Sequence, residues 1–306
     1  KSQPLDYHSP YRLWRYDMQM LNHENRRTGS VMAGVFAAVV ACAAMGASLS
    51  GTAWAQTAQE VSAEAWASLK PDVFGNRPIQ ADTGVVQILA PKRAQEAGLV
   101  PIDIQIDPVK AGGTITSITL IIDVNPSPLA AVFQLGENSG VTKLSTRVRV
   151  NDYSYVRAIA ETATGELHMA EAFVKASGGC SAPAVKNQDE ARASLGVMKL
   201  RQFPPQEGTS ANARHELQLM IRHPNHSGFQ MDQVTRYFIP PHFVNKVKVS
   251  QDGLLVLNME GGISISEDPN FRFNFIAKSG GEIEVEAVDT DGQVFRDKWP
   301  VEELGL

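Results

Sequence analysis

Short segments in which apolar and polar residues alternate recur along most of the chain. A period of two puts the apolar side chains on one face of an extended strand. The clearest examples are Ile102, Ile104 and Ile106; Ile118, Leu120 and Ile122; Phe271, Phe273 and Phe275; and Ile283, Val285 and Ala287. Turn-forming pairs such as Asp291-Gly292 separate these segments. Many short strands with one buried face predict an all-β protein built as a sandwich.

The alternation is interrupted once in the middle of the chain. Residues 181–195 hold Pro, Asn, Gln and charged residues with little apolar content, and we interpret 181–199 as a linker. A length of 306 residues agrees with about two domains. We therefore predict two β-sandwich domains in tandem, over 56–180 and 200–306. A short helix over Ser62–Leu69, with Ser62 as its N-cap, is expected before the first strands.

The first 55 residues have the pattern of an export signal and are set apart from the folded chain. Arg26-Arg27 precedes an apolar stretch over 31–49, and Ala53-Trp54-Ala55 is an A-x-A cleavage site. Cleavage after Ala55 predicts a periplasmic protein without a stable membrane span. Because the stretch is rich in Ala and Gly, a permanent span is the weaker alternative.

Two further interpretations of this segment stay open. Val39-Val40-Ala41-Cys42 resembles a bacterial lipobox, which would make Cys42 a lipidated first residue. The chain does not begin with Met, so Met18 or Met20 could be the start of the natural protein.

Cys180 is the residue with the most distinctive chemistry. The chain has two cysteines, and removal of the signal segment with Cys42 would leave Cys180 alone. An unpaired cysteine in an exported protein implies an intermolecular bond or a reactive thiol. Gly178 and Gly179 precede it and Ser181 follows it, which predicts a flexible arm with little steric cover. We interpret Cys180 as a covalent attachment point for a cargo; the alternative is a half-buried structural cysteine at the end of a strand.

The remaining signals for chemistry are weak. His223 and His226 have an H-x-x-H spacing that could bind a metal with His242, and Asp232 lies nearby. We favour a proline-rich loop whose histidines bond to backbone groups, and we expect no metal and no cofactor. A net charge of −5 without a basic stripe excludes nucleic acid as an expected partner.

Several motifs in both halves resemble one known family. Phe173 to Cys180, ending in Gly-Gly-Cys, resembles the carboxyl-terminal end of the SoxY sulfur carrier. Segments of the second half resemble its partner SoxZ: Ile221-Arg222-His223-Pro224, Ile239-Pro240-Pro241-His242-Phe243 and Asp289-Thr290-Asp291-Gly292. The order of the two halves is similar to quinoprotein-dehydrogenase-associated SoxYZ-like carriers, as are the segments 125–128 and 261–270.

The resemblance implies two immunoglobulin-like sandwiches and a carrier that is not itself an enzyme. In SoxYZ, the thiol bears thiosulfate-derived intermediates and carries them between periplasmic sulfur-oxidising enzymes, including a haem-containing oxidase. Cys180 matches the carrier position of that family. The resemblance also implies a second hypothesis: an accessory or binding module of a PQQ-dependent (quinoprotein) alcohol dehydrogenase system.

One departure from the family pattern concerns the arm. Ser181-Ala182-Pro183 follows Cys180 where SoxY has two glycines and the end of the chain. An arm that continues into a second domain is tethered at both ends, so its reach into a partner enzyme would be shorter.

Overall fold

The computed structural model describes residues 57–182, 193–203, 214–278 and 280–302. The signal segment, the lipobox and the A-x-A site lie outside these residues. The first half contains helix α2 (Ala58–Phe74) and strands β1 (Ile79–Ala81), β2 (Val86–Leu89), β3 (Val100–Ile106), β4 (Ile115–Ile122), β5 (Leu129–Leu135), β6 (Lys143–Val148), β7 (Ser154–Thr162) and β8 (Leu167–Val174). The second half contains β9 (Met198–Phe203), β10 (Arg214–Ile221), β11 (Val244–Gln251), β12 (Leu254–Gly261), β13 (Asn270–Ile276), β14 (Glu282–Asp289) and β15 (Val294–Pro300).

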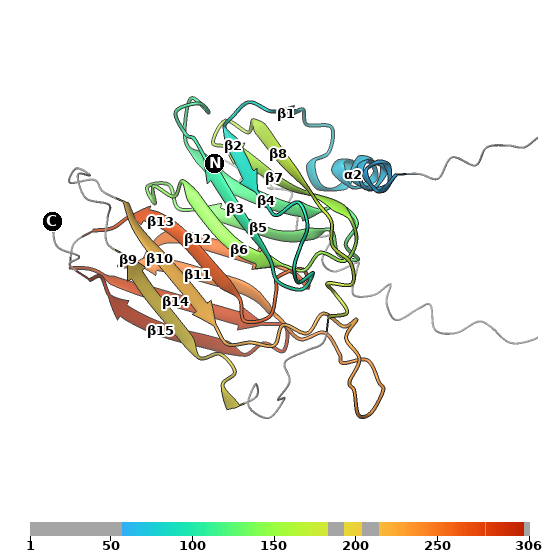
Figure 1. Cartoon of the computed structure of the whole chain (residues 1–306). Coiled ribbons are helices and arrows are strands. Elements are labelled where there is room, and N and C mark those ends of the chain that lie inside the picture. Colours follow the sequence, from blue (N-terminus) through green and yellow to red (C-terminus); the bar gives the residue numbers. More distant parts are fainter. Residues whose placement is uncertain (1–56, 183–192, 204–213, 279, 303–306) are drawn as a thin grey trace, which may run out of the picture. The chain divides into compact units, whose positions relative to one another are not determined.

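The strands form two sheets, which confirms the predicted all-β sandwich (Figure 1). The larger sheet has nine strands in the order β1-β8-β7-β4-β5-β12-β11-β14-β15, and the smaller has six in the order β2-β3-β6-β13-β10-β9. The predicted immunoglobulin-like character of each half remains a prediction.

Each sheet runs without interruption through both halves of the chain. In the larger sheet β5 pairs with β12 from Leu135↔Leu257 to Ala131↔Gly261, and in the smaller sheet β6 pairs with β13 at Leu144↔Phe273. The buried residues of both halves belong to one hydrophobic cluster. The two halves therefore join edge to edge and share a core, and the domain bounds 56–180 and 200–306 remain predictions.

The strands follow the alternation in the sequence. All seven residues of β3 alternate between buried and exposed, and Ile102, Ile104 and Ile106 are on the buried face. The predicted hairpin at Asp291-Gly292 is confirmed by the pairing of Val288 with Val294 across it. The second half begins with β9 at Met198, inside the segment 181–199 that we interpreted as a linker; residues 183–192 lie outside the described part.

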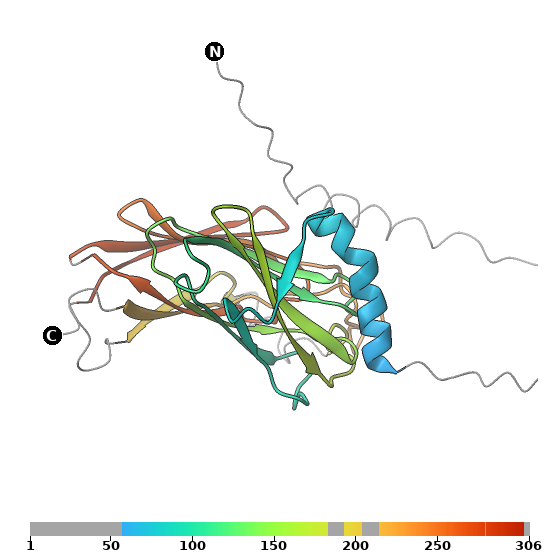
Figure 2. The same cartoon turned by 90° about the horizontal axis from the view of Figure 1, so that it is seen from above.

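Helix α2 is longer than predicted and begins earlier. Thr57, not Ser62, is the N-cap, and Thr57 and Glu60 form a reciprocal capping box. Ser62 is instead buried, and its hydroxyl donates to Asp123 at 2.8 Å and accepts from the backbone of Tyr155. Figure 2 shows the helix running crosswise to the strands of the first half, and it contacts β7. Within the described residues no helix is both long and apolar enough for a membrane crossing.

Candidate functional site

The segment that carries Cys180 leaves the end of β8 in an extended conformation. β8 ends at Val174, and Lys175 continues alongside the segment 92–94. The Lys175 N–H donates to the Lys92 carbonyl at 3.0 Å, and the Ala94 N–H donates to the Lys175 carbonyl at 3.0 Å. This pairing therefore fixes the chain at Lys175, three residues before Gly178.

Residues 178–182, called the arm from here on, dock against the loop that follows β6. The Gly178 N–H donates to the Asn151 carbonyl at 2.7 Å, and the Gly179 N–H donates to Val150 at 3.2 Å. The Cys180 N–H donates to the Asn151 side-chain oxygen at 3.3 Å. Gly178 has φ = 75°, a left-handed conformation that glycine adopts without steric cost. These bonds hold the three peptide groups that precede Cys180.

Gly179 is required at its position because neighbouring backbone approaches it very closely. A Cβ there would lie 2.3 Å from the Ala97 carbonyl oxygen and 2.5 Å from that of Val150. The two glycines thus have different tasks in this conformation. Gly178 permits the turn, and Gly179 permits the contact.

The second half of the chain closes over the arm from the other side. The loop between β10 and β11 (222–243) supplies Ser227, whose hydroxyl donates to the Cys180 carbonyl, and Gln230, whose amide donates to the Ala182 carbonyl at 3.0 Å. Gln230 also accepts the Ser227 N–H at 3.3 Å, which links the two side chains. Cys180 therefore lies where the two halves meet.

The thiol is covered in this structure. Cys180 is a free cysteine with 0% of its surface exposed, so the expectation of little steric cover is wrong for this conformation. Burial raises the pKa of the Cys180 thiol to about 11, and the positive charge of Arg149 offsets this only in part. The docked thiol is therefore protonated at neutral pH and is a poor nucleophile. The flexibility of Gly178, Gly179 and Ser181 remains a prediction.

Arg149 is the charged residue beside the arm. Its alternation with Val148 and Val150 in the sequence predicts a side chain on the polar face of a strand, but the side chain is buried. One guanidinium nitrogen donates to the Gly179 carbonyl at 3.4 Å and another donates to the Asn225 carbonyl at 3.1 Å. The guanidinium therefore bridges the arm and the second half.

Two motifs that carried the family resemblance form the support beneath this region. The Asn125 amide nitrogen donates to the Arg149 carbonyl at 2.7 Å and to the Ser264 hydroxyl at 2.8 Å. Its side-chain oxygen accepts the Asn151 N–H at 2.8 Å. Asn125 and Ser264 could have been found from the motifs 125–128 and 261–270, whereas the strand pattern gave no signal for Arg149.

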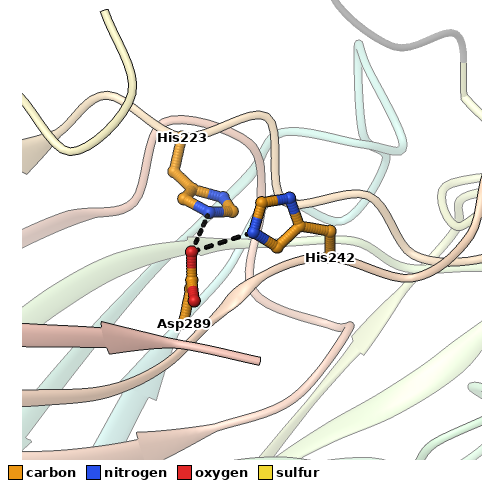
Figure 3. Close-up of side chains that lie close together, drawn as sticks. All are labelled: His223, His242 and Asp289. Carbon is orange, nitrogen blue, oxygen red and sulfur yellow. Dashed lines mark hydrogen bonds and ion pairs between the residues drawn. The ribbon is translucent and has the colours of Figure 1, made fainter. Parts of the chain in front are cut away.

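A second polar cluster lies where the loop over 222–243 meets the end of β14. His223, His242 and Asp289 bring their ring nitrogens and carboxylate oxygen within 4.8 Å of one another (Figure 3). His242 Nε2 is 2.8 Å from Asp289 Oδ2, and His223 Nε2 is 3.6 Å from the same oxygen. The structure thus brings together two of the three histidines that we considered. His226 instead pairs through its backbone with His242, and Asp232 bonds to its own loop.

The hydrogen bond to His223 Nδ1 indicates whether this cluster can bind a metal ion. The Asn225 N–H donates to His223 Nδ1 at 3.0 Å, which places the proton of the neutral ring on Nε2. A metal ligand needs a lone pair on the nitrogen that faces the ion. The arrangement therefore fits a carboxylate facing two imidazole rings better than a metal centre. Burial lowers the pKa of His223 to about 4, with His242 acting in the same direction and Asp289 against it.

Comparisons with known proteins match the two halves to two families. Residues 70–180 match the family "Sulfur oxidation protein SoxY", and residues 202–300 match the family "Sulphur oxidation protein SoxZ". The first match ends at Cys180. No curated protein matches the chain.

The solved structures that are similar to this chain include the following three. The sulfur carrier protein SoxY from Chlorobium limicola f thiosulfatophilum is 26% identical, and the alignment covers 38% of this chain and 95% of that chain at a TM-score of 0.33. A beta-glycosidase from Bacteroides vulgatus is 10% identical, with 74% and 25% covered at a TM-score of 0.22. A glycosyl hydrolase family 2 member from Bacteroides cellulosilyticus DSM 14838 is 12% identical, with 75% and 30% covered at a TM-score of 0.20.

Proposed function

Since the chain carries a SoxY domain and a SoxZ domain fused in that order, we propose that it is a periplasmic carrier which holds a sulfur-containing group covalently on Cys180. It presents this group to partner enzymes of sulfur oxidation and catalyses no reaction itself. The observation that carries the proposal is the place of Cys180. It is the last residue of the SoxY match and follows Gly-Gly, and the SoxZ half holds its carbonyl.

The burial of Cys180 divides the carrier cycle into two states. In the docked state the thiol is covered and its pKa is raised to about 11, which protects it from adventitious oxidants. In an undocked state the solvated thiol would return to a pKa of about 8.5, and a useful fraction would be thiolate. Undocking must break the bonds of the arm to Val150, Asn151 and Arg149 in the first half, and to Ser227 and Gln230 in the second.

The loading step can be written without a partner enzyme. The Cys180 thiolate attacks an inner sulfur of tetrathionate, a Cys–S–S–SO₃⁻ adduct forms, and thiosulfate leaves with the electron pair of the broken S–S bond. Loading from thiosulfate itself releases one proton and two electrons. Those electrons require an acceptor such as the haem-containing oxidase that the family resemblance implies.

Intact-mass measurement of the protein isolated from its native periplasm tests the proposal. We expect an adduct of sulfur and oxygen on Cys180 that reductant removes, and a mature chain that begins at Gln56. Cys180→Ser should fold normally and carry no adduct. An unmodified thiol under every growth condition, or the same adduct on the Cys180→Ser variant, would refute the carrier function.

The complete burial of Cys180 favours one second candidate. The protein would be a binding module of a quinoprotein dehydrogenase system, with Cys180 as a core residue. In that case Cys180→Ser would still co-purify with the dehydrogenase. Loss of that association in Cys180→Ser would count against this candidate.

A further inference from the structure

We propose that Arg149 is an anion-binding residue which selects negatively charged cargo on Cys180 and holds its terminal oxygens when the arm is docked. This inference rests on the proposed function of Cys180. It adds the residue of this chain that binds the charged end of the cargo.

The hydrogen-bonding capacity of Arg149 is poorly used. Only 1% of the residue is exposed, and its Nε has no hydrogen-bond partner. Its two contacts are to the neutral carbonyls of Gly179 and Asn225, and the one to Gly179 is long at 3.4 Å. A guanidinium has five N–H groups and binds oxyanions with two parallel bonds, so Arg149 can accept a far better partner.

The positive charge of Arg149 has no bonded counter-ion in the described part of the chain. Glu267 is near enough to influence Arg149, but no ion pair within 4.0 Å joins them in the described part of the chain. Glu267 Oε2 is itself buried without a hydrogen-bond partner, and burial raises the pKa of the Glu267 carboxyl above its ordinary value. A buried cation without a bonded counter-ion is costly. An anion delivered to this place would remove that cost.

The guanidinium of Arg149 lies close to the residue that would carry the cargo. The guanidinium donates to Gly179, the residue directly before Cys180, and Cys180 is near enough for a negative charge on it to act on Arg149. Loading converts the neutral thiol into a group that carries a negative charge beyond the sulfur. That charge then lies beside a buried cation, and the weak bond to the Gly179 carbonyl can be given up in exchange. A neutral adduct of similar size offers no such compensation.

Two adducts of opposite character test this on the wild-type protein. Tetrathionate gives Cys–S–S–SO₃⁻ as above. Methyl methanethiosulfonate gives the uncharged Cys–S–S–CH₃, with methanesulfinate leaving. Both are prepared on the mature chain under mild denaturant and confirmed by mass, and the denaturant is then removed. We expect the melting temperature of the sulfonated protein to exceed that of the methylthiolated protein by about 3 °C or more. An equal or lower value would overturn the inference.

Variants identify the residue responsible. Arg149→Met should abolish the difference between the two adducts, and Arg149→Lys should keep part of it. Arg147→Met is the matched control, because Arg147 lies two residues earlier and bonds to the Asp268 carbonyl away from the arm. A difference that persists in Arg149→Met would refute the role of Arg149. If that variant does not fold, the wild-type comparison and Arg149→Lys still decide.

Reaction rates give a second readout. Cys180 reacts with two disulfide reagents, the anionic 5,5′-dithiobis(2-nitrobenzoate) and the neutral 4,4′-dithiodipyridine. The rate with the anionic reagent divided by the rate with the neutral one should be lower in Arg149→Lys and Arg149→Met than in the wild type, by up to about tenfold. An unchanged ratio in both variants would contradict the selection of anions. The outcomes are separable from those of the proposed function. A cysteine never loaded in the periplasm refutes the carrier, whereas one loaded without regard to charge refutes only Arg149.

Discussion

Gly179 shows how a residue chosen for flexibility can also be required for docking. Its Cβ position is filled by backbone atoms of Ala97 and Val150, which are hydrogen-bonded to each other at 2.8 Å. Gly179→Ala should therefore undock the arm while the sandwich stays folded. A clash of this kind costs about 1–3 kcal/mol, so the undocked population should rise roughly ten- to hundredfold. The measurement is the rate at which neutral 4,4′-dithiodipyridine reacts with Cys180.

Gly113→Ala is the control for this prediction. Nothing lies within 4 Å of the Cβ position of Gly113, and its φ is not positive. Its thiol reactivity should equal that of the wild type. If Gly179→Ala also reacts at the wild-type rate, the docked arm described above is not the dominant state in solution.

His223 should make the stability of the fold depend on pH. Burial is the main cause that holds its pKa near 4, below the ordinary value of 6.5. Between these two values the unfolded chain binds a proton at this residue and the folded chain does not, so stability falls as the pH falls from 6.5 to 4. The loss is on the order of 1 kcal/mol per pH unit. The lowered pKa of Asp289 acts in the same direction, below its ordinary value of 3.8.

The variant His223→Asn tests this, because its side-chain oxygen can still accept the Asn225 N–H. Urea denaturation at a series of pH values should give a flatter curve for His223→Asn than for the wild type between pH 6.5 and 4. Parallel curves would show that His223 does not supply the pH dependence.

Among the elements, the loop over 222–243 of the second half bonds to the arm of the first half. Its root bonds to the arm through Ser227 and Gln230, while its tip over 232–235 bonds to itself. Ser227→Ala removes one bond to the Cys180 carbonyl, which is worth about 0.5–1.5 kcal/mol. We expect the thiol to react about three- to tenfold faster with the neutral disulfide.

A matched control comes from the same loop. The Thr235 hydroxyl bonds to Asp232 at 3.0 Å and makes no contact with the arm, so Thr235→Ala should leave the rate unchanged. An equal increase in both variants would mean that loop stability in general, and not the bond from Ser227, controls access to Cys180.

The elements also show what a sequence pattern can and cannot predict. The strands around Ile104 and Phe273 were predictable because each has one buried face, which imposes a period of two. Arg149 was misplaced because the alternation assigns a charged residue to the exposed face by default. Only three-dimensional proximity to Gly179 and Asn225 shows why it is buried. Ser62 was misassigned for a similar reason, since its partners Asp123 and Tyr155 are distant in the sequence.

At the scale of the whole molecule, the pairing of edge strands between the two halves was not predictable from the sequence. β5 and β12 both read as ordinary strands with a buried face, and nothing in their residues says which strand each lies beside. An unpaired edge exposes a row of backbone donors and acceptors, and pairing β5 with β12 and β6 with β13 removes these edges from both halves. The linker is then not what holds the halves together.

A cleavage site for a specific protease, inserted between residues 183 and 192, tests this. Because two sheets and one core span both halves, the nicked chain should elute as a single species of unchanged size and should separate only in denaturant. Cys180 should remain slow to react, since Ser227 is held in place by the sheets and not by the linker. Uncut chain with the same insertion is the control. Separation of the two pieces in native buffer would mean that the shared edges are too weak to join the halves, and that the covalent fusion is what keeps Cys180 covered.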